Sequence, residues 1–364
     1  WRHPDYPDGL AFFDTKHNCA AILGMSYFGE IKKGTLTLAW ATAARNNYVS
    51  CHGGLKIFRK EGDSYVASFF GLSGSGKSTL THAKHDDKYD IEVLHDDAFV
   101  ISVEDGSSVA LEPSYFDKTN DYPAGHREQD YFVTVQNCGV TLDENGRKVL
   151  VTEDIRNGNG RTIKSRYSTP NRVDKIQEPI QSIFWIMKDD ALPPLVKITD
   201  PRLASILGCT LMTKRSTAEN TGAGANLDAL VIEPYANPFR VYPLVEDYEK
   251  FKALFDKGVD CYIINTGDFL GKKVTKEVSL GVIETVVDGK ANFELFGGLP
   301  GMEYLPVEGY EVPDMNGEYA ELIRDRMQFR LDYLKAFNDA NPEHQIPQDA
   351  LESIKTIERF IDVL

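Results

Sequence analysis

The sequence predicts an α/β fold with a mixed β-sheet built around a glycine-rich loop. That loop, residues 71–78, fits the pattern G-x-x-x-x-G-K-[ST] at every position. An apolar, aromatic and β-branched run at 65–70 precedes it and predicts a buried strand, and residues 79–84 after it can begin a helix. Strand, glycine-rich loop and helix in this order favour a phosphate-binding loop over a chance glycine-rich turn.

The loop residues have the chemistry that a nucleoside triphosphate requires. Glycines let backbone N–H groups close around phosphate oxygens, and the start of a helix adds a positive dipole end. We expect Lys77 to reach the β- and γ-phosphates of ATP, and the Ser78 hydroxyl to ligate Mg²⁺. The predicted nucleotide-binding residues of this segment are Gly71, Leu72, Ser73, Gly74, Ser75, Gly76, Lys77, Ser78 and Thr79.

Further apolar runs and periodic segments complete the predicted α/β pattern. Short apolar runs between turns predict strands at 20–23, 91–94, 131–135, 183–187 and 261–264. Apolar residues that recur at steps of three and four predict helices at 320–334 and 351–361. Two polar, glycine-containing stretches predict loops: hairpin turns or an exposed loop at 141–161, and a mobile loop or lid at 217–226.

Bulk composition limits the classes of function. The chain has 364 residues, enough for two domains or one large domain, and its 42% hydrophobic and 26% charged residues are ordinary for a globular protein. A formal net charge of −15 argues against nonspecific nucleic-acid binding. No apolar run reaches eighteen residues, so we expect no membrane span.

The cysteines and the start of the chain indicate the compartment. Five cysteines without a C-x-x-C pair suit a reducing cytoplasm and argue against a cysteine-rich zinc site. The chain begins at Trp1, without Met and without a signal-peptide pattern. We therefore expect a cytoplasmic protein and interpret the sequence as a fragment.

An acidic pair stands at the end of the next predicted strand. Asp96 and Asp97 follow the apolar run 91–94, downstream of the glycine-rich loop. A carboxylate at a strand end beside a phosphate loop commonly holds the metal of the nucleotide. The alternative is a solvated turn, and the position after an apolar strand favours the metal-binding role.

Four segments together resemble one enzyme family. They are Gly-Glu-x-Lys-Lys-Gly at 29–34, His52 nineteen residues after Lys33, Phe-Phe-Gly-Leu-Ser-Gly-x-Gly-Lys-Ser-Thr-Leu at 69–80, and Asp-Asp at 96–97. From about Asp8 to about Leu334, the chain resembles ATP-dependent phosphoenolpyruvate carboxykinase. Weaker matches are an arginine segment at 165–170, a strand with Leu-Pro-Pro at 183–198, and a segment at 264–274 that resembles the adenine side of the family's nucleotide site.

The resemblance implies a reaction and two metal ions. In this family oxaloacetate loses CO₂, and the resulting enolate takes the γ-phosphoryl group of ATP to give phosphoenolpyruvate, a reaction of gluconeogenesis. Mg²⁺ would accompany ATP at Ser78, and Mn²⁺ would be held by Lys33, His52 and Asp97. A lysine ligand must be neutral, because only the neutral amine has a lone pair. The implied catalytic residues are Lys32, Lys33, Lys77, Arg166 and Tyr27, and the implied adenine-side residues are Lys273, Val274 and Ser279.

The lysine pair and the histidine support this interpretation only together. Lys32 and Lys33 alone would indicate a solvated basic turn, and His52 alone would more often be structural. Their spacing next to the glycine-rich loop and the acidic pair is what favours metal ligation.

The resemblance also divides the chain. Residues 1–48 would be the remnant of an N-terminal substrate-binding domain, and 49–364 a P-loop nucleotide- and metal-binding domain of the carboxykinase type. Because the arginine segment and residues 213–216 depart from the family pattern, two alternatives stay open. One is a related P-loop kinase without decarboxylation, and the other is a non-catalytic nucleotide-binding homologue. No pattern in the sequence indicates an oligomeric state.

Overall fold

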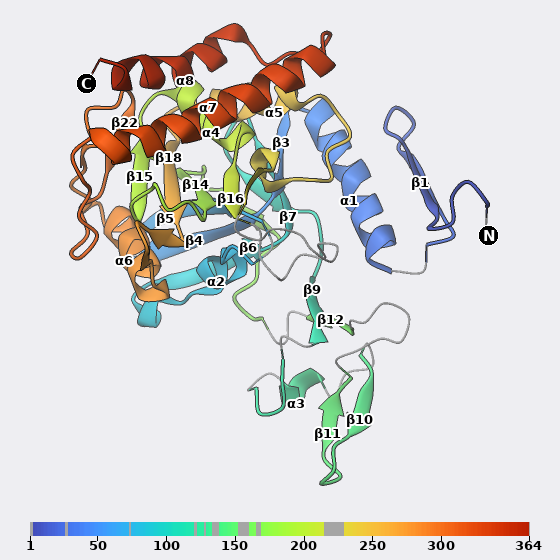
Figure 1. Ribbon diagram of the computed structural model, residues 1–364. Helices are drawn as coiled ribbons and strands as arrows, with labels where there is room; N and C mark the ends of the chain where they lie inside the picture. The colour runs from blue at the N-terminus through green and yellow to red at the C-terminus, as the bar shows by residue number, and fades with distance from the viewer. Residues whose placement is uncertain are drawn as a thin grey trace.

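A large mixed β-sheet forms the centre of the protein (Figure 1). The computed structural model describes residues 3–25, 28–72, 74–119, 122–126, 129–132, 138–151, 160–164, 169–214 and 229–363. Within these residues the sheet has eight strands in the order β21-β22-β15-β18-β14-β5-β4-β6. Their bounds are β4 (Gly54–Lys60), β5 (Asp63–Phe70), β6 (Asp90–His95), β14 (Ser182–Met187), β15 (Leu195–Ile198), β18 (Asp260–Asn265), β21 (Glu294–Leu295) and β22 (Met302–Tyr304).

The middle of this sheet is parallel and its edges are antiparallel. β14 runs parallel to both β5 and β18. The pairs β4–β5, β4–β6, β15–β18, β15–β22 and β21–β22 are antiparallel. All six residues of β14 are buried. A strand that is covered on both faces needs apolar residues at nearly every position, which explains the sequence Ser-Ile-Phe-Trp-Ile-Met.

Alternate residues of the central strands point into two separate cores. Phe70 and Trp185 belong to one core, which includes residues of α4, α5, α7 and α8. Phe69 and Phe184 stack at 5.1 Å in the other core, with residues of α2 and α6. Figure 1 shows α7 and α8 on one side of the sheet and α6 and α2 on the other, so the sheet lies between two helical layers. The bounds are α2 (Lys77–His82), α4 (Pro201–Cys209), α5 (Leu244–Asp256), α6 (Lys276–Val287), α7 (Gly317–Ala340) and α8 (Gln348–Ile361).

A smaller antiparallel sheet carries the first helix. Its strand order is β13-β8-β7-β3, and α1 packs on it through Leu36 and Trp40, which contact Ala98 and Val100. The bounds are α1 (Phe28–Arg45), β3 (Tyr48–His52), β7 (Ala98–Ser102), β8 (Ser108–Ala110) and β13 (Lys175–Ile176). The proposed boundary between residues 48 and 49 stays a prediction.

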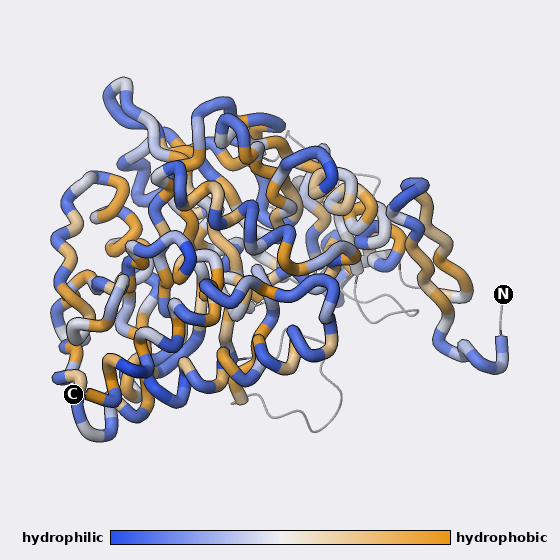
Figure 2. The backbone as a smooth tube through the Cα atoms, turned by 90° about the horizontal axis from the view of Figure 1, so that it is seen from above, coloured by the Kyte–Doolittle hydropathy of each residue, from blue (hydrophilic) through white to orange (hydrophobic). Residues whose placement is uncertain are grey.

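Short two-stranded sheets complete the described structure. The hairpin of β1 and β2 projects from the body near the N-terminus (Figure 2). The segment with β9, β12, α3, β10 and β11 extends away from the central sheet (Figure 1). The bounds are β1 (Leu10–Asp14), β2 (Cys19–Leu23), β9 (Tyr115–Lys118), α3 (Gln129–Phe132), β10 (Val140–Leu142), β11 (Lys148–Leu150), β12 (Arg161–Lys164), β16 (Met212–Lys214), β17 (Leu230–Ile232), β19 (Asp268–Phe269) and β20 (Lys272–Lys273), with short 3-10 helices at His85–Asp87 and Pro234–Ala236.

Most of the predicted elements are confirmed, and one is wrong. The α/β class, the mixed sheet, the strands at 20–23, 65–70, 91–94, 183–187 and 261–264, and both late helices are present. The strand predicted at 131–135 is wrong where it is described, because residues 129–132 form the helix α3. Phe132 is buried there against Tyr122 and Leu150, and so short an aromatic run has no periodicity that distinguishes a helical turn from a strand. Residues 133–135 lie outside the described ranges.

The loop predictions are described only in part. A hairpin of β10 and β11 confirms the first half of the stretch 141–161, with a turn in which Asp143 Oδ1 accepts from the N–H groups of Asn145 and Arg147. Residues 152–159 and the lid predicted at 217–226 lie outside the described residues. None of the helices within the described ranges combines the length and the hydropathy that a membrane-spanning segment requires.

Two helical glycines differ in what surrounds them, and this difference predicts opposite effects of one substitution. A Cβ at Gly208 in α4 would lie 2.6 Å from Trp185 Cζ2, whereas a Cβ at Gly281 in α6 would meet nothing within 4 Å. We expect Gly208→Ala to destabilise the fold by about 1–3 kcal/mol through overpacking. We expect Gly281→Ala to stabilise it by about 0.5–1 kcal/mol, because alanine loses less backbone entropy. Urea unfolding measures both, and equal midpoints for the two variants would contradict the packing described.

Candidate active site

The glycine-rich loop closes tightly between β5 and α2. A Cβ at Gly71 would lie 2.3 Å from Ser75 Oγ and 2.9 Å from Ile186 Cβ, so only glycine fits there. Gly76 has a φ of 100°, in the left-handed region, and its position directly before α2 turns the chain into that helix. The Ser75 hydroxyl is buried and has no hydrogen-bond partner among the described residues. Ser73 lies outside the described residues.

Two residues that directly follow neighbouring strands donate hydrogen bonds to this loop. Lys188, directly after β14, donates from Nζ to the carbonyl of Gly74 at 2.7 Å. Thr266, directly after β18, donates from Oγ1 to the carbonyl of Ser75 at 2.7 Å. Because β5, β14 and β18 are parallel, their carboxyl ends meet at one edge of the sheet, where ligands bind in open α/β sheets.

The same edge gathers the other predicted site residues. β4 runs antiparallel to β5, and β6 antiparallel to β4, so β6 points in the same direction as β5. Asp96 and Asp97 follow the carboxyl end of β6, and His52 precedes the amino end of β4. The sheet topology therefore places the acidic pair and the histidine beside the glycine-rich loop.

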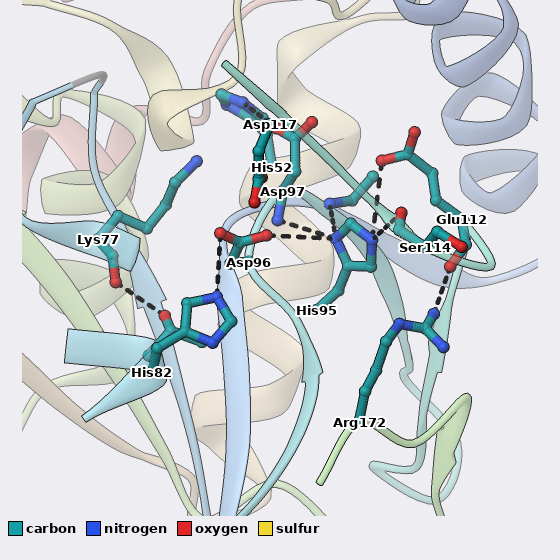
Figure 3. Close-up of polar contacts among 12 residues, drawn as sticks. His52, Lys77, His82, His95, Asp96, Asp97, Glu112, Ser114, Asp117 and Arg172 are labelled. Carbon is teal, nitrogen blue, oxygen red and sulfur yellow. Dashed lines mark hydrogen bonds and ion pairs between the residues drawn. The ribbon is translucent and has the colours of Figure 1, made fainter. Parts of the chain in front are cut away.

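His95 holds the acidic turn in one conformation (Figure 3). Its Nδ1 accepts from the backbone N–H groups of Asp97 at 3.0 Å and Ala98 at 3.1 Å. Two donors at Nδ1 assign the ring proton to Nε2, which faces the carbonyl of Ser114 at 3.4 Å. Burial lowers the pKa of His95 to about 4, so the ring is neutral and the turn keeps this cap at neutral pH.

Asp97 is the centre of a cluster of nitrogen groups. Its carboxylate lies 2.7 Å from Lys32 Nζ, 2.8 Å from Lys33 Nζ and 3.0 Å from His52 Nε2. Burial by itself would raise the pKa of Asp97, but the neighbouring His52 ring and the charge of Lys33 hold it well below the ordinary value. Asp97 is therefore an anion at every physiological pH.

The two lysines of α1 differ in their electrostatic surroundings. Burial disfavours the charged form of both. Lys32 lies between Asp97 and Glu112, the latter at 3.3 Å, and these two carboxylates more than offset burial and raise its pKa. For Lys33, burial and the neighbouring charge of Lys32 outweigh the attraction of Asp97, and the pKa of Lys33 is lowered. Lys32 is thus held as a cation, whereas Lys33 is closer to the neutral form that can act as a ligand.

His52 presents a lone pair to Asp97. Its Nδ1–H donates to the carbonyl of Ala236, so Nε2 carries no proton in the neutral ring. Burial, followed by the charge of Lys77, lowers the pKa of His52 to about 4. Two lone pairs therefore face each other across the 3.0 Å between Nε2 and Asp97 Oδ1, which is favourable only with a cation beside both.

The donor set fits a divalent cation. Adjacent ligands on an octahedral ion with bonds of about 2.1 Å lie ~3 Å apart. That is the separation of His52 Nε2 and Asp97 Oδ1, and a nitrogen and oxygen set suits Mn²⁺. The described residues contain no group of three or more His, Cys, Asp or Glu side chains that could hold a metal, so this candidate site depends on Lys33 as its third member.

Lys77 and Ser78 stand at the amino end of α2. No described side chain lies within ion-pair distance of the Lys77 ammonium, and burial lowers its pKa despite the attraction of Asp97. In Figure 3 the Lys77 side chain points toward Asp97 and His52. The Ser78 residue is exposed. Behind them Asp96 pairs with His82 at 3.2 Å, and this hydrogen bond holds the pKa of Asp96 well below its usual range although burial opposes it.

The predicted adenine-side residues differ in their exposure to solvent. Lys273 is exposed in β20, and its Nζ donates to the carbonyl of Thr266 at 3.4 Å, next to the glycine-rich loop. Val274 is buried in the main core. Ser279 is buried in α6 and donates its hydroxyl to the carbonyl of Thr275 at 3.1 Å, so the structure does not bring that hydroxyl to a surface.

Some predicted residues are not described, and others were missed. Tyr27 and Arg166 lie outside the described residues, so their roles stay predictions. The sequence reasoning missed several residues whose only local signal is a polar side chain at or after a strand end: His95, Glu112, Lys188 and Thr266.

Comparison with known proteins identifies the family. A family model described as phosphoenolpyruvate carboxykinase matches residues 6–314. The chain belongs to the phosphoenolpyruvate carboxykinase family. It is similar to phosphoenolpyruvate carboxykinase (ATP) from Aeropyrum pernix, with 24% identity over an alignment that covers 90% of this chain and 70% of that protein. Carboxykinases of this family are carboxy-lyases that convert oxaloacetate to phosphoenolpyruvate with ATP, and this is the activity of the chain.

A buried carboxylate supports the segment behind His52. Phe239 packs edge-on against the His52 ring at 5.5 Å. Three residues further on, Tyr242 donates its hydroxyl to Asp247 Oδ1 in α5 at 2.9 Å. Asp247 is almost fully buried, and this burial raises its pKa to about 6.

This raised pKa predicts a pH dependence of stability. Between the ordinary value of 3.8 and about 6, the folded chain binds a proton at Asp247 that the unfolded chain has lost. The free energy of unfolding should therefore fall as pH rises through this range, by about 3 kcal/mol for two pKa units. Asp247→Asn removes the ionisation, so its stability relative to the parent should improve from pH 4 to pH 7. Urea unfolding at both pH values measures this, and a pH-independent difference would contradict the assignment.

Proposed function

We propose that the edge formed by the glycine-rich loop, the Asp96–Asp97 turn and the Lys33–His52 pair is the site at which oxaloacetate is decarboxylated and phosphorylated by ATP. The observation that carries this proposal is the convergence of Lys33 and His52 on Asp97, beside Lys77. A simple phosphate-binding loop needs no such set of nitrogen groups around a partly buried carboxylate. Family membership supports the same reaction.

The glycine-rich loop would bind the triphosphate of ATP. Its backbone N–H groups and the start of α2 supply donors and a positive dipole end. Lys77 adds a charge for which no ion pair among the described residues competes. Ser78 would hold the Mg²⁺ that accompanies ATP. Lys273 and Val274 would form the adenine side, and Ser279 would contribute by fixing the first turn of α6.

Lys33, His52 and Asp97 would hold Mn²⁺. A divalent cation bound there supplies positive charge next to the oxygen that becomes negative when CO₂ leaves. Burial keeps His52 neutral, and the bond from Nδ1 to Ala236 fixes the tautomer, so the lone pair of Nε2 stays available. The lowered pKa of Lys33 acts in the same direction.

The remaining charged residues would act on the phosphoryl group. After decarboxylation the enolate oxygen attacks the γ-phosphorus in line with the departing ADP oxygen. Lys77 and Lys32 would neutralise the charge that spreads over the phosphoryl oxygens, and the pairing of Lys32 with Glu112 keeps that amine protonated and oriented. Arg166 would add a planar donor fork, and Tyr27 would contact the substrate.

Removal of the loop lysine tests the nucleotide site. Lys77→Ala should weaken MgATP binding and lower phosphoryl transfer by at least ~10²-fold, because it removes charge that stabilises the transition state. Lys84→Ala, an exposed lysine just beyond α2, is the matched control and should behave as the parent. Calorimetric titration with MgATP and an assay of phosphoenolpyruvate formation give the two readouts. Unchanged affinity and turnover in Lys77→Ala would refute the assignment.

Replacement of Lys33 tests the metal site independently of turnover. Lys33→Arg keeps the positive charge but offers no accessible lone pair, so it should lose Mn²⁺ as completely as Lys33→Ala. Lys60→Arg, a partly exposed lysine at the end of β4, should leave Mn²⁺ affinity unchanged. Electron paramagnetic resonance of free Mn²⁺ measures binding. If Lys33→Arg binds Mn²⁺ as tightly as the parent, Lys33 is not a ligand.

A further inference from the structure

A buried lysine lies behind the glycine-rich loop and belongs to no part of the site described above. Lys56, in β4, is fully buried. Its Nζ donates to the carbonyl of Leu80 at 2.7 Å and to that of Ala83 at 3.1 Å, and it lies 2.9 Å from His85 Nε2. An ammonium group has three donors, and these three acceptors use all of them.

His85 connects Lys56 to α6. Its Nδ1 lies 2.9 Å from Glu284 Oε1. With Nε2 accepting from Lys56, the neutral ring carries its proton on Nδ1 and donates it to the carboxylate. Lys56, His85 and Glu284 therefore form a continuous hydrogen-bonded chain from β4 to α6, which we call the Lys–His–Glu chain.

The backbone that delivers His85 is strained. His85, Asp86 and Asp87 have φ values of 54°, 52° and 57°, all in the left-handed region that non-glycine residues rarely adopt. Three such residues in succession persist only when their surroundings hold them, and such strain gathers at functional positions. Here the turn sets the imidazole between a buried amine and a carboxylate.

The Lys–His–Glu chain acts on the helix that begins with Lys77. Leu80 lies in α2 and Ala83 directly follows it, so Lys56 places its amine at the carboxyl end of α2. Burial lowers the pKa of Lys56 to about 7, and the helix dipole at this end favours the cationic form. Thr81 Oγ1 donates to the carbonyl of Lys77 at 2.8 Å. A Cβ at Gly54 would lie 1.9 Å from this Thr81 Oγ1. β4 therefore fixes α2 at two points, by close approach at Gly54 and by hydrogen bonds at Lys56.

Packing alone does not require a charged residue here. Replacing a buried ion pair with apolar residues of similar volume is often neutral or stabilising. Phe58 already lies against the amine, with its ring centroid 4.6 Å from Nζ, so an apolar side chain of the same length would have partners. What the charged group adds is a fixed position for α2.

We propose that Lys56 is a positioning residue for nucleotide binding, which with His85 and Glu284 holds α2 so that Lys77 and Ser78 meet the phosphates of ATP. This inference rests on the proposed nucleotide site. The Lys–His–Glu chain also connects α2 to α6, the helix that follows the adenine-side residues Lys273 and Val274. Lys56 thereby couples the phosphate end of the nucleotide site to its adenine end.

Two variants, each with a matched control, test the proposal. Lys56→Met keeps the length of the side chain and removes its charge and donors, and Lys60→Met is the control on the same strand. Glu284→Gln weakens the other end of the Lys–His–Glu chain. Lys88→Met is its control, because it removes the ion pair of Glu284 with Lys88 but leaves the hydrogen bond of Glu284 with His85. Calorimetry with MgATP, the two Michaelis constants and thermal unfolding are measured for each protein.

The expected result is specific to the nucleotide. Lys56→Met should weaken MgATP binding and raise the KM for MgATP by about tenfold, since small displacements of a binding group are costly. The KM for oxaloacetate should not change. Glu284→Gln should shift MgATP affinity in the same direction by a smaller factor, and both controls should match the parent.

The outcomes separate this inference from the proposed function. If Lys77→Ala weakens MgATP binding while Lys56→Met and Glu284→Gln bind as the parent does, the positioning role is wrong and the nucleotide site stands. If Lys77→Ala binds MgATP as tightly as the parent, the proposed site and this inference both fail. A Lys56→Met protein that does not fold leaves the decision to Glu284→Gln, whose unchanged affinity would overturn the proposal. A uniform rise of both Michaelis constants would also overturn it, because it would indicate general loosening.

Discussion

The candidate site depends on the contacts of one partly buried carboxylate, that of Asp97. It draws Lys32 and Lys33 from α1 and His52 from β3 into one space, where three nitrogen groups would otherwise lack compensation for lost hydration. The surroundings of these three groups make them unlike one another. Asp97 and a second carboxylate, Glu112, together keep Lys32 cationic, whereas burial lowers the pKa of Lys33 and His52. One anion therefore supports a charged donor and two nitrogens suited to metal ligation.

The direction of the strands determines where this anion can act. β5, β6, β14 and β18 all end at one edge of the sheet, so the glycine-rich loop, the acidic turn, Lys188 and Thr266 leave the sheet side by side. The hydrogen bonds of Lys188 and Thr266 to the loop are made possible by this shared edge. The two apolar cores on either face keep the edge rigid, because every residue of β14 is buried between them.

The short helix α2 links this edge to the interior. At its amino end, glycine geometry and the anchors from neighbouring strands place the loop. At its carboxyl end, Lys56 binds the last carbonyl groups and continues through His85 to Glu284. A helix of six residues has little stability of its own, so its position is set by the groups at its two ends. The helix dipole favours a cation at the carboxyl end, where Lys56 lies, and an anion at the amino end, where the phosphates would bind.

The sequence by itself determined the α/β class, the buried strands, the late helices and the glycine-rich loop, because each of these is a local pattern of apolar periodicity or of glycines. The resemblance further indicated that Lys33, His52 and Asp97 belong to one site. The tertiary structure alone decided that Glu112 partners Lys32, that His95 caps the acidic turn, and that the helix α3 includes the first two residues of a predicted strand. Such contacts join residues that are distant in the chain, and which strands become neighbours depends on the packing of the whole sheet rather than on any single segment.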